Sequence, residues 1–253
     1  MAWSLSVLRW AISIRRGRGR RMMQLLSCAV IAAGATSTVA DVQLIRLAHS
    51  AEPSDLDVRI IREGDWWRLD YVRKGVSFTT ANELHVPAGV RFTMAWSGIP
   101  PPWIENALCV PQSNRCVFVA GSPSIRDMRF VTLWPPAWRR LRIVVQSRDQ
   151  FERWALNEAQ PARTSQGSLF RNAGCGYCHV IRGVIDEAFH PAPDLTHFAS
   201  RATIAGTNLP NRLGQLAGWV VHSRGLKRTS EMPDNALAPD DLHAVVALLQ
   251  SLR

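Results

Sequence analysis

The most informative motif of this chain is the stretch Gly174-Cys175-Gly176-Tyr177-Cys178-His179. It has the form C-x-x-C-H, in which two thiols three positions apart can each add to one vinyl group of the same porphyrin. The imidazole that follows the second thiol then binds the iron. The motif therefore predicts one covalently attached haem c, with Cys175 and Cys178 as attachment points and His179 as the proximal ligand.

A C-x-x-C pair also occurs in redox disulfides and in zinc sites. A redox disulfide needs βαβ surroundings, and a zinc site needs another Cys or His pair. Neither is found near this motif, so the haem interpretation is preferred.

The sixth iron ligand is expected to be Met232, 53 residues after His179 and in the loop before a terminal helix. A thioether there gives His/Met ligation, which raises the reduction potential and suits electron transfer. A lone Met often fills a core instead, but this loop is polar and contains a proline. His190, His197 and His222 are the competing ligands.

The formal charge of +10 on 253 residues could indicate a nucleic-acid partner. Residues 1–40 hold six arginines and no acid, which leaves 24 basic and 20 acidic side chains elsewhere. The arginines precede the apolar run Leu25–Ala35 and the small-residue site Thr38–Ala40, the order of a secretory signal peptide. We therefore expect no nucleic-acid partner, cleavage before Asp41, and export to the periplasm or the outer face of the bacterial inner membrane.

Other interpretations of this leader stay open. It could be an uncleaved N-terminal anchor, although the apolar run is shorter than the about 20 residues of a membrane span. Translation could start at Met22 or Met23. Cys28 could be a lipid-attachment site, but the apolar stretch before it is very short, and we interpret it as part of the signal.

The next part of the chain has short segments in which apolar residues alternate with polar ones, separated by Gly or Pro. This period of two, with β-branched and aromatic residues, predicts an all-β sandwich. The expected strands are Asp57–Arg62, Trp66–Val72, Val90–Trp96, Met128–Trp134 and Arg140–Val145.

Helical patterns begin at Ser147, where Ser147 and Gln150 can form a capping box for a short helix. A polar linker, Asn157–Ser165, is expected to follow it. Gly167 beside Phe170 would permit close crossing with the terminal helix. That helix starts at Pro239 and carries one apolar stripe: Leu242, Val245, Val246, Leu249 and Leu252. A further helix is expected around Leu213, Leu216, Trp219 and Val220.

Three segments of the strand-rich part resemble the cupredoxin domain of cytochrome c oxidase subunit II. They are Trp66–Tyr71, Thr80–Gly89, which contains the specific A-N-E-L-H-V-P sequence, and Trp138–Val145. In that family the domain holds a binuclear copper centre with two His, two Cys of a C-x-x-x-C loop, and a Met.

This sequence departs from the family at each copper ligand. Pro100–Trp103 stands where the first His is expected, and the C-x-x-x-C loop is missing, because Trp134 is followed directly by Pro135-Pro136. The loop His and Met would fall at about Pro136 and Arg139. Proline and arginine offer copper no ligand, so the resemblance implies a cupredoxin-like scaffold without copper.

Cys109 and Cys116 lie seven positions apart, with six residues between them, and outside the ligand loop of that family. A disulfide is expected, because an even leftover pair in an oxidising compartment is usually bridged. A salvaged metal site with Met94 or Met128, and two free thiols, remain alternatives. His85 is expected to be a surface residue at a strand end rather than a ligand.

The last part of the chain resembles the cytochrome c domain fused to the C-terminus of some bacterial oxidase subunit II chains. The matching pieces are Cys175–Gly183, Ala192–His197, Asn211, Trp219, Met232-Pro233 and Val246–Leu252. By this resemblance, Pro193 would lie against His179, and Arg201 near a haem propionate.

The sequence as a whole predicts a multi-domain α+β protein, a cupredoxin-like β-sandwich followed by an all-α class I cytochrome c domain. The expected segments are the signal peptide 1–40, the copper-free domain 41–148, the helix and linker 149–165, and the cytochrome c domain 166–253.

The expected role is electron transfer to a membrane-embedded haem-copper oxidase or related reductase from an electron-donor protein, with no independent catalytic site. Alternatives are a stand-alone periplasmic shuttle or sensor, and a copper-dependent subunit whose ligands lie elsewhere.

Overall fold

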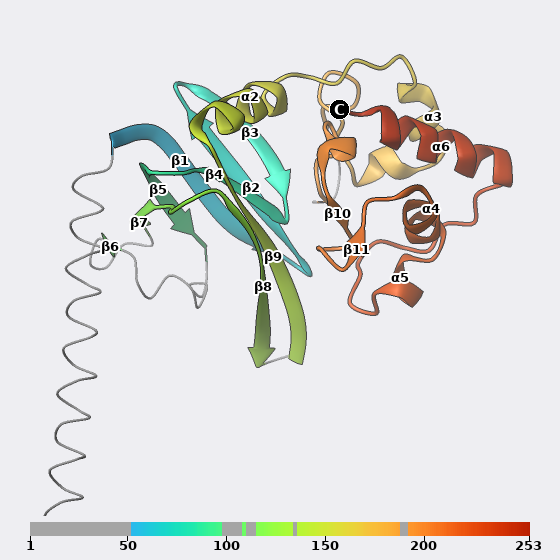
Figure 1. Cartoon of the computed structure of the whole chain (residues 1–253). Helices are drawn as coiled ribbons and strands as arrows, with labels where there is room; N and C mark the ends of the chain where they lie inside the picture. The colour runs from blue at the N-terminus through green and yellow to red at the C-terminus, as the bar shows by residue number, and fades with distance from the viewer. Residues whose placement is uncertain (1–51, 98–107, 110–114, 134–135, 188–191) are drawn as a thin grey trace, which may run out of the picture. The chain divides into compact units, whose positions relative to one another are not determined.

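The computed structural model describes residues 52–97, 108–109, 115–133, 136–187 and 192–253 (Figure 1). The predicted signal peptide, residues 1–40, lies outside these ranges, so its cleavage, anchoring and start site stay predictions. Residues 51–253 form one compact unit. No helix within the described ranges has the length and apolar character that crossing a membrane requires.

Strands make up the first part of the described chain. In β5 (Val90–Trp96) buried and half-buried side chains alternate at every position, the period that a strand with one face in a core requires. The other strands are β1 (Glu52–Glu63), β2 (Trp66–Arg73), β3 (Val76–Ala81), β4 (Glu83–Pro87), β6 (Leu108–Cys109), β7 (Arg115–Val119), β8 (Ser124–Leu133) and β9 (Pro136–Gln146).

The predicted strands all lie within observed ones, except that Trp134 falls outside the described residues. Among the described residues the strands pair as a six-stranded sheet, in the order β3-β2-β1-β5-β7-β6, and a three-stranded sheet, β4-β9-β8. β1 pairs with β5, and β4 with β9, in parallel; the other neighbours in these two sheets are antiparallel. Four strands, β3, β4, β6 and β7, were not predicted, and these two sheets do not by themselves identify a cupredoxin.

One hydrophobic core joins both sheets. It includes Leu69 of β2, Leu84 of β4 and Leu141 of β9, each almost fully buried. Tyr71 is also fully buried, and its hydroxyl donates to the carbonyl of His85 at 3.1 Å and accepts from the His85 amide at 2.9 Å. Burial raises the pKa of Tyr71. This hydroxyl therefore ties the two sheets together.

Helix α2 (Arg148–Glu158) covers this core, and the predicted capping box is confirmed. The Ser147 hydroxyl accepts from the Gln150 amide, and the Gln150 side chain accepts from the Ser147 amide. Trp154 of α2 stacks on the His85 ring, with 4.2 Å between ring centroids. The prediction that His85 is a surface residue is therefore wrong: α2 folds over the end of β4 and covers it.

Helices and tight turns make up the rest of the chain. Its elements are α3 (Gly167–Asn172), the 3-10 helices η2 (Cys175–Tyr177) and η3 (Phe198–Ser200), the short strands β10 (Thr203–Ile204) and β11 (Leu209–Pro210), and the helices α4 (Leu213–Val221), α5 (Ser223–Leu226) and α6 (Pro239–Ser251).

A second hydrophobic core lies among these helices. The predicted stripe of α6 is confirmed: Val245, Val246, Leu249 and Leu252 are buried in it, and Leu242 packs against it. Helix α6 contacts α3 and α4. The prediction that Gly167 permits a close crossing with the terminal helix is wrong. A Cβ at this position would lie 2.5 Å from the Val184 side chain, and not against α6. The described chain is thus sheet-rich before residue 147 and helical after it.

Candidate haem-binding site

The C-x-x-C-H motif folds into one tight turn after α3. Gly174 has a φ of +75°, a conformation that side chains disfavour, and it starts the 3-10 helix η2. The amides of Cys178 and His179 both donate to the Cys175 carbonyl, at 3.2 and 3.0 Å. The two thiols and the imidazole are therefore held on a single turn of chain.

Both thiols of the motif are free and half-buried. Burial raises the pKa of Cys175, and the nearby Cys178 adds to this effect. Attachment to a vinyl group requires reduced thiols, and neither cysteine is part of a disulfide. Cys175 and Cys178 are thus available for the reaction that the motif predicts.

His179 is held in the tautomer that an iron ligand needs. Its Nδ1 lies 2.8 Å from the carbonyl oxygen of Pro193. Because a carbonyl oxygen can only accept a hydrogen bond, the proton of the neutral ring is on Nδ1, which leaves the lone pair of Nε2 available to a metal. Pro193 was predicted to lie against His179, and the structure has it there. Its role toward haem stays a prediction.

The environment of His179 also favours the neutral ring. Burial lowers the pKa of the imidazole, and the positive charge of Arg201 lowers it further, while the bond to Pro193 and the charge of Asp194 act in the opposite direction. A neutral imidazole is the ligand form of histidine. The site therefore holds His179 ready for metal without a proton to displace.

The segment that carries Pro193 is itself fixed. Asp194 accepts from the amide and hydroxyl of Thr196 at 2.8 and 2.5 Å and from Arg182 Nε at 3.0 Å. Arg201 donates to the Asp194 carbonyl and lies over the Phe198 ring. These bonds hold the acceptor of His179 in position, and they place Arg201 beside it; the propionate contact of Arg201 stays a prediction.

Met232 lies half-buried in the loop between α5 and α6, with both of its backbone polar groups bound. Its amide donates to the hydroxyl of Ser230 at 3.2 Å, and its carbonyl accepts from the hydroxyl of Ser223 at 2.7 Å. Both serines are buried. The backbone of the predicted sixth ligand is thus fixed on both sides, which limits where its thioether can go.

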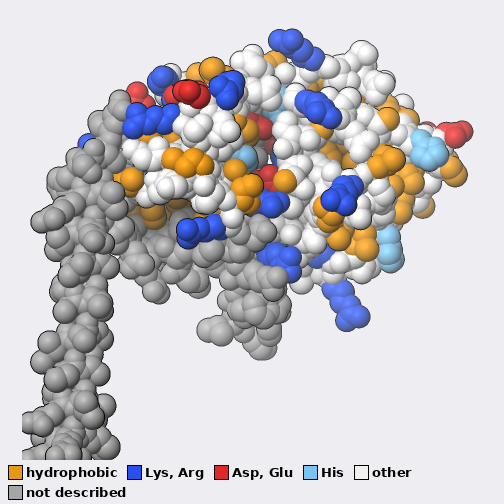
Figure 2. Space-filling view, viewed as in Figure 1, with side chains coloured by type: hydrophobic (Ala, Val, Ile, Leu, Met, Phe, Trp, Pro, Cys, Tyr) orange, Lys and Arg blue, Asp and Glu red, His pale blue; other side chains and the backbone are white. Residues whose placement is uncertain are grey.

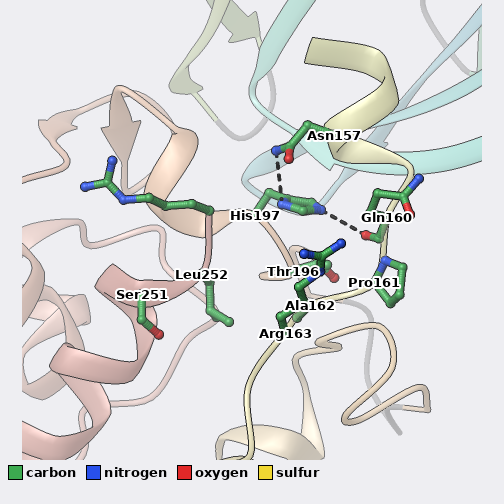
Figure 3. Close-up of a pocket in the computed structure, with 10 residues that line it drawn as sticks. Asn157, Gln160, Pro161, Ala162, Arg163, Thr196, His197, Ser251 and Leu252 are labelled. Atoms are coloured by element: carbon green, nitrogen blue, oxygen red, sulfur yellow. Dashed lines mark hydrogen bonds between the residues drawn. The ribbon is translucent and has the colours of Figure 1, made fainter. Parts of the chain in front are cut away.

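The structure argues against two of the competing histidines. His197 is buried, and its Nε2 lies 2.9 Å from the Gln160 carbonyl while its Nδ1 lies 3.4 Å from the Asn157 amide nitrogen, so both ring nitrogens are engaged (Figure 3). His222 is exposed and bonds Asp234 at 3.1 Å. His190 lies outside the described residues.

Figure 3 shows that His197 belongs to a pocket between the end of α2 and the last residues of the chain. The pocket has a volume of about 220 Å³, less than the about 300–1,000 Å³ usual for ligand sites. Its histidine is already bonded to two other lining residues, Asn157 and Gln160, so we interpret the pocket as a contact region between segments.

Cys116 is buried and disulfide-bonded, and the strand register places Cys109 of β6 directly opposite it. This excludes the alternatives in which Cys116 is a free thiol or a metal ligand. The described residues contain no group of three or more His, Cys, Asp or Glu side chains that could hold a metal ion. Much of the compared copper region, including Pro100–Trp103 and Trp134-Pro135, lies outside those residues, so the absence of copper stays a prediction.

Charged side chains are spread over the face shown in Figure 2. Lys and Arg side chains there stand mostly apart, with hydrophobic and uncharged groups between them. Such spacing is typical of solvated surface charges.

Several residues that hold the site were not predicted. Ser223 and Ser230 could have been noticed as polar neighbours of Met232, whereas Arg182 and Asp194 act across 12 residues and give no local signal. The sequence predicted the groups proposed to bind haem and the position of Pro193 against His179, but not the other residues that hold them.

Of the comparisons with known proteins, the family model bears on this site. Residues 167–253 match the protein-family model described as cytochrome c. The chain matches none of the curated proteins. Among solved structures it is similar to one chain of a crystal structure of the mixed-disulfide intermediate between the thioredoxin-like protein TlpAs and CoxBPD, subunit II of cytochrome c oxidase. That likeness has 18% identity and a TM-score of 0.30, and it covers 41% of this chain and 90% of that one; at such a TM-score it does not identify a fold.

Residues 167–253 are therefore a cytochrome c domain, and membership of that family implies electron transfer by a covalently bound haem c. The residues present fit the group: two free thiols on one turn, an imidazole with Nε2 available, and a methionine on a fixed backbone. A haem held there supplies a one-electron iron couple.

Proposed function

We infer that this chain is an exported electron-transfer protein that carries one haem c, attached through Cys175 and Cys178 and ligated by His179 and Met232. The observation that carries the proposal is the bond from His179 Nδ1 to the Pro193 carbonyl. It sets the ring in the ligand tautomer, within a C-x-x-C-H turn and inside the residues that match cytochrome c. His/Met ligation suits a high-potential carrier.

The sheet-rich part is proposed to be a subunit-II-like, cupredoxin-like domain without copper, which docks the cytochrome on a haem-copper oxidase or a related reductase. The support is the residue-level resemblance of Trp66–Tyr71, Thr80–Gly89 and Trp138–Val145, and the order of the two parts along the chain. Pro193 and Arg201 are assigned to the haem surroundings on the same resemblance. The place of action is the periplasm or the outer face of the inner membrane.

The test of haem attachment uses the pyridine haemochrome spectrum of the full chain. Cys178→Ala should leave at most one thioether, which shifts the haemochrome band or abolishes haem retention. Met232→Ala should keep the haem but remove the weak red charge-transfer band of Met-ligated ferric haem. An unshifted haemochrome band and full haem retention in Cys178→Ala would contradict the assignment.

The test of the partner is co-purification from membranes. An integral-membrane oxidase or reductase subunit should be recovered with the chain, and metal analysis should give one iron and no copper per chain. Recovery of the chain alone would favour a soluble shuttle or sensor. Two coppers per chain would support a working copper centre with other ligands.

A further inference from the structure

The loop that carries Met232 rests on the β1–β2 turn of the sheet-rich part. Lys227, five residues before Met232, forms an ion pair with Asp65 in that turn, with 2.6 Å between Lys227 Nζ and Asp65 Oδ2. The same ammonium group donates to the Asp65 carbonyl at 3.0 Å. Both side chains are largely buried, 11% and 13% exposed, so this pair is protected from screening by salt.

Two glycines let the segments come this close. Gly64, with a φ of +46°, precedes Asp65, and a Cβ at this position would overlap the Glu231 carboxylate. Gly206, with a φ of +64°, lies in the turn between β10 and β11, where a Cβ would stand 2.7 Å from Lys227 Nζ. The Asp65–Lys227 pair therefore lies where the β1–β2 turn, the β10–β11 turn and the Met232 loop meet.

A continuous set of hydrogen bonds runs from this pair to Met232. The carbonyl of Lys227 accepts from the Ser230 amide at 2.8 Å, and the hydroxyl of Ser230 accepts from the Met232 amide at 3.2 Å. The amide of Lys227 donates to the Ser223 carbonyl at 2.9 Å, and the Ser223 hydroxyl donates to the Met232 carbonyl at 2.7 Å. Movement of Lys227 would loosen both serine contacts of Met232.

We propose that Asp65 and Lys227 are positioning residues for the sixth iron ligand, so that the sheet-rich part holds the Met232 loop closed over the haem site. This inference rests on the proposed His/Met ligation. In this proposal the two residues act by stabilising the loop conformation in which Met232 is presented, and not as iron ligands. An external ligand for ferric iron can enter only when the Met232 thioether leaves, so its apparent affinity reports how often the loop opens.

The experiment titrates the oxidised full chain with imidazole at fixed pH and follows the loss of the red methionine band. Asp65→Asn should reach half-loss at about tenfold lower imidazole concentration than the parent chain, which corresponds to about 1.4 kcal/mol of loop closure. Lys227→Gln should behave in the same way, and the double variant should be no worse than either single one, since the two residues form one interaction.

Glu63→Gln is the matched control. It removes a carboxylate two residues away that pairs with Arg68 of β2, 2.5 Å apart, within the sheet-rich part, and its imidazole midpoint should stay within about twofold of the parent. An unchanged midpoint in both Asp65→Asn and Lys227→Gln overturns this proposal alone. A parent chain with bound haem but no methionine band overturns the assignment of Met232 as well.

Discussion

At the level of single residues, the hydrogen-bond partners of a histidine ring decide whether one of its nitrogens can bind a metal. His179 and His197 are both in the cytochrome c domain, but only His179 keeps one nitrogen available, because its single described bond goes from Nδ1 to a carbonyl. His197 has a partner at each nitrogen. The motif predicted that His179 is an iron ligand. Only the hydrogen bonds in the structure argue against His197 as the other ligand.

Ser223 provides a test of how the backbone of Met232 is held. Its hydroxyl is fully buried and donates to the Met232 carbonyl. Ser223→Ala leaves that carbonyl without this donor, which should destabilise the ligated loop by about 1–3 kcal/mol. The measurement is guanidinium unfolding followed by the red methionine band.

Ser251→Ala is the control for this change, because the Ser251 hydroxyl also donates to a backbone carbonyl, that of Leu248, but at the end of α6 rather than beside Met232. The Ser251→Ala variant should lose the methionine band at the same guanidinium concentration as the parent chain. Equal effects of the two substitutions would mean that Ser223 has no special relation to Met232.

At the level of elements, α2 serves as the connection between the two hydrophobic cores. Its Phe151 and Ala155 are buried in the first core, and the carbonyl of its last residue, Glu158, accepts from Arg182 of the cytochrome c domain. The helix thus runs two residues into the predicted linker Asn157–Ser165. The helix begins at a capping box next to the sheet-rich part and ends in a contact with the cytochrome c domain, so it links the two parts.

The Glu158 side chain should be destabilising at neutral pH. Burial raises its pKa, and the charges of Arg201, His197, His85 and Arg182 offset this only in part. The folded state therefore binds more protons than the unfolded state above the ordinary Glu pKa of about 4.3, and stability falls as pH rises through that window. Glu158→Gln should raise the free energy of unfolding by roughly 1 kcal/mol at pH 7.

Urea unfolding at neutral and acidic pH measures this effect. The gain should disappear near pH 4, where the parent carboxyl is protonated as well. Glu152→Gln in the same helix is the control, since it removes a carboxylate paired with Arg73 and should be neutral or slightly destabilising. A loss of stability in Glu158→Gln at pH 7 would contradict the predicted sign.

The pairing of β6 with β7 predicts which thiol completes the disulfide of Cys116. Cys109 is directly opposite Cys116 in the register, and paired residues of adjacent antiparallel strands are close enough to be bridged. Mass spectrometry of the non-reduced protein should find one peptide that joins the two. Cys109 with a free thiol, or joined to another cysteine, would disprove the pairing.

At the level of the whole molecule, Glu83 connects the sheet-rich part to the cytochrome c domain. Its buried carboxylate accepts from the Ala202 amide at 3.2 Å and from the Thr203 amide and hydroxyl at 2.8 and 2.6 Å. With the Asp65–Lys227 pair and the Arg182 bonds to α2, this gives three separate connections within residues 51–253. The cytochrome c domain is therefore fixed on the sheet-rich part at several points.

Glu83→Gln should destabilise the folded chain by about 1–3 kcal/mol at neutral pH, because an amide cannot accept all three bonds. Burial alone would raise the pKa of Glu83, but the nearby His85 and the bonds from Thr203 and Ala202 outweigh it, and the net pKa is lowered. The contribution of this carboxylate is therefore complete above the ordinary Glu pKa of about 4.3 and is lost as pH falls through the lower folded value.

Thermal unfolding of parent and variant between pH 3 and pH 7 checks this prediction. The difference in melting temperature should be largest at pH 7 and shrink below about pH 4. Asp70→Asn, which affects a half-exposed carboxylate bonded to Thr79 within the first sheet, is the control and should show a small effect. A constant difference across the range would mean that the charge of Glu83 has no part in the connection.

Local patterns sufficed for much of this structure. The C-x-x-C-H turn, the capping box at Ser147, the stripe of α6 and five strands were predicted from the sequence and are found in the structure. Each depends on residues within about one or two turns of chain, where spacing alone sets which groups share a face. For the same reason, the sequence identified the two thiols and the proximal imidazole as a unit.

The tertiary structure decided the rest. Glu83 bonds residues about 120 positions away, and Asp65 meets Lys227 across 162 positions. No periodicity or motif contains such pairs, because they exist only when the segments around the two hydrophobic cores bring their turns together. The sequence determined that the chain has a haem attachment motif and a methionine in a later loop; the packing of the sheet-rich part against that loop determined how the methionine is held.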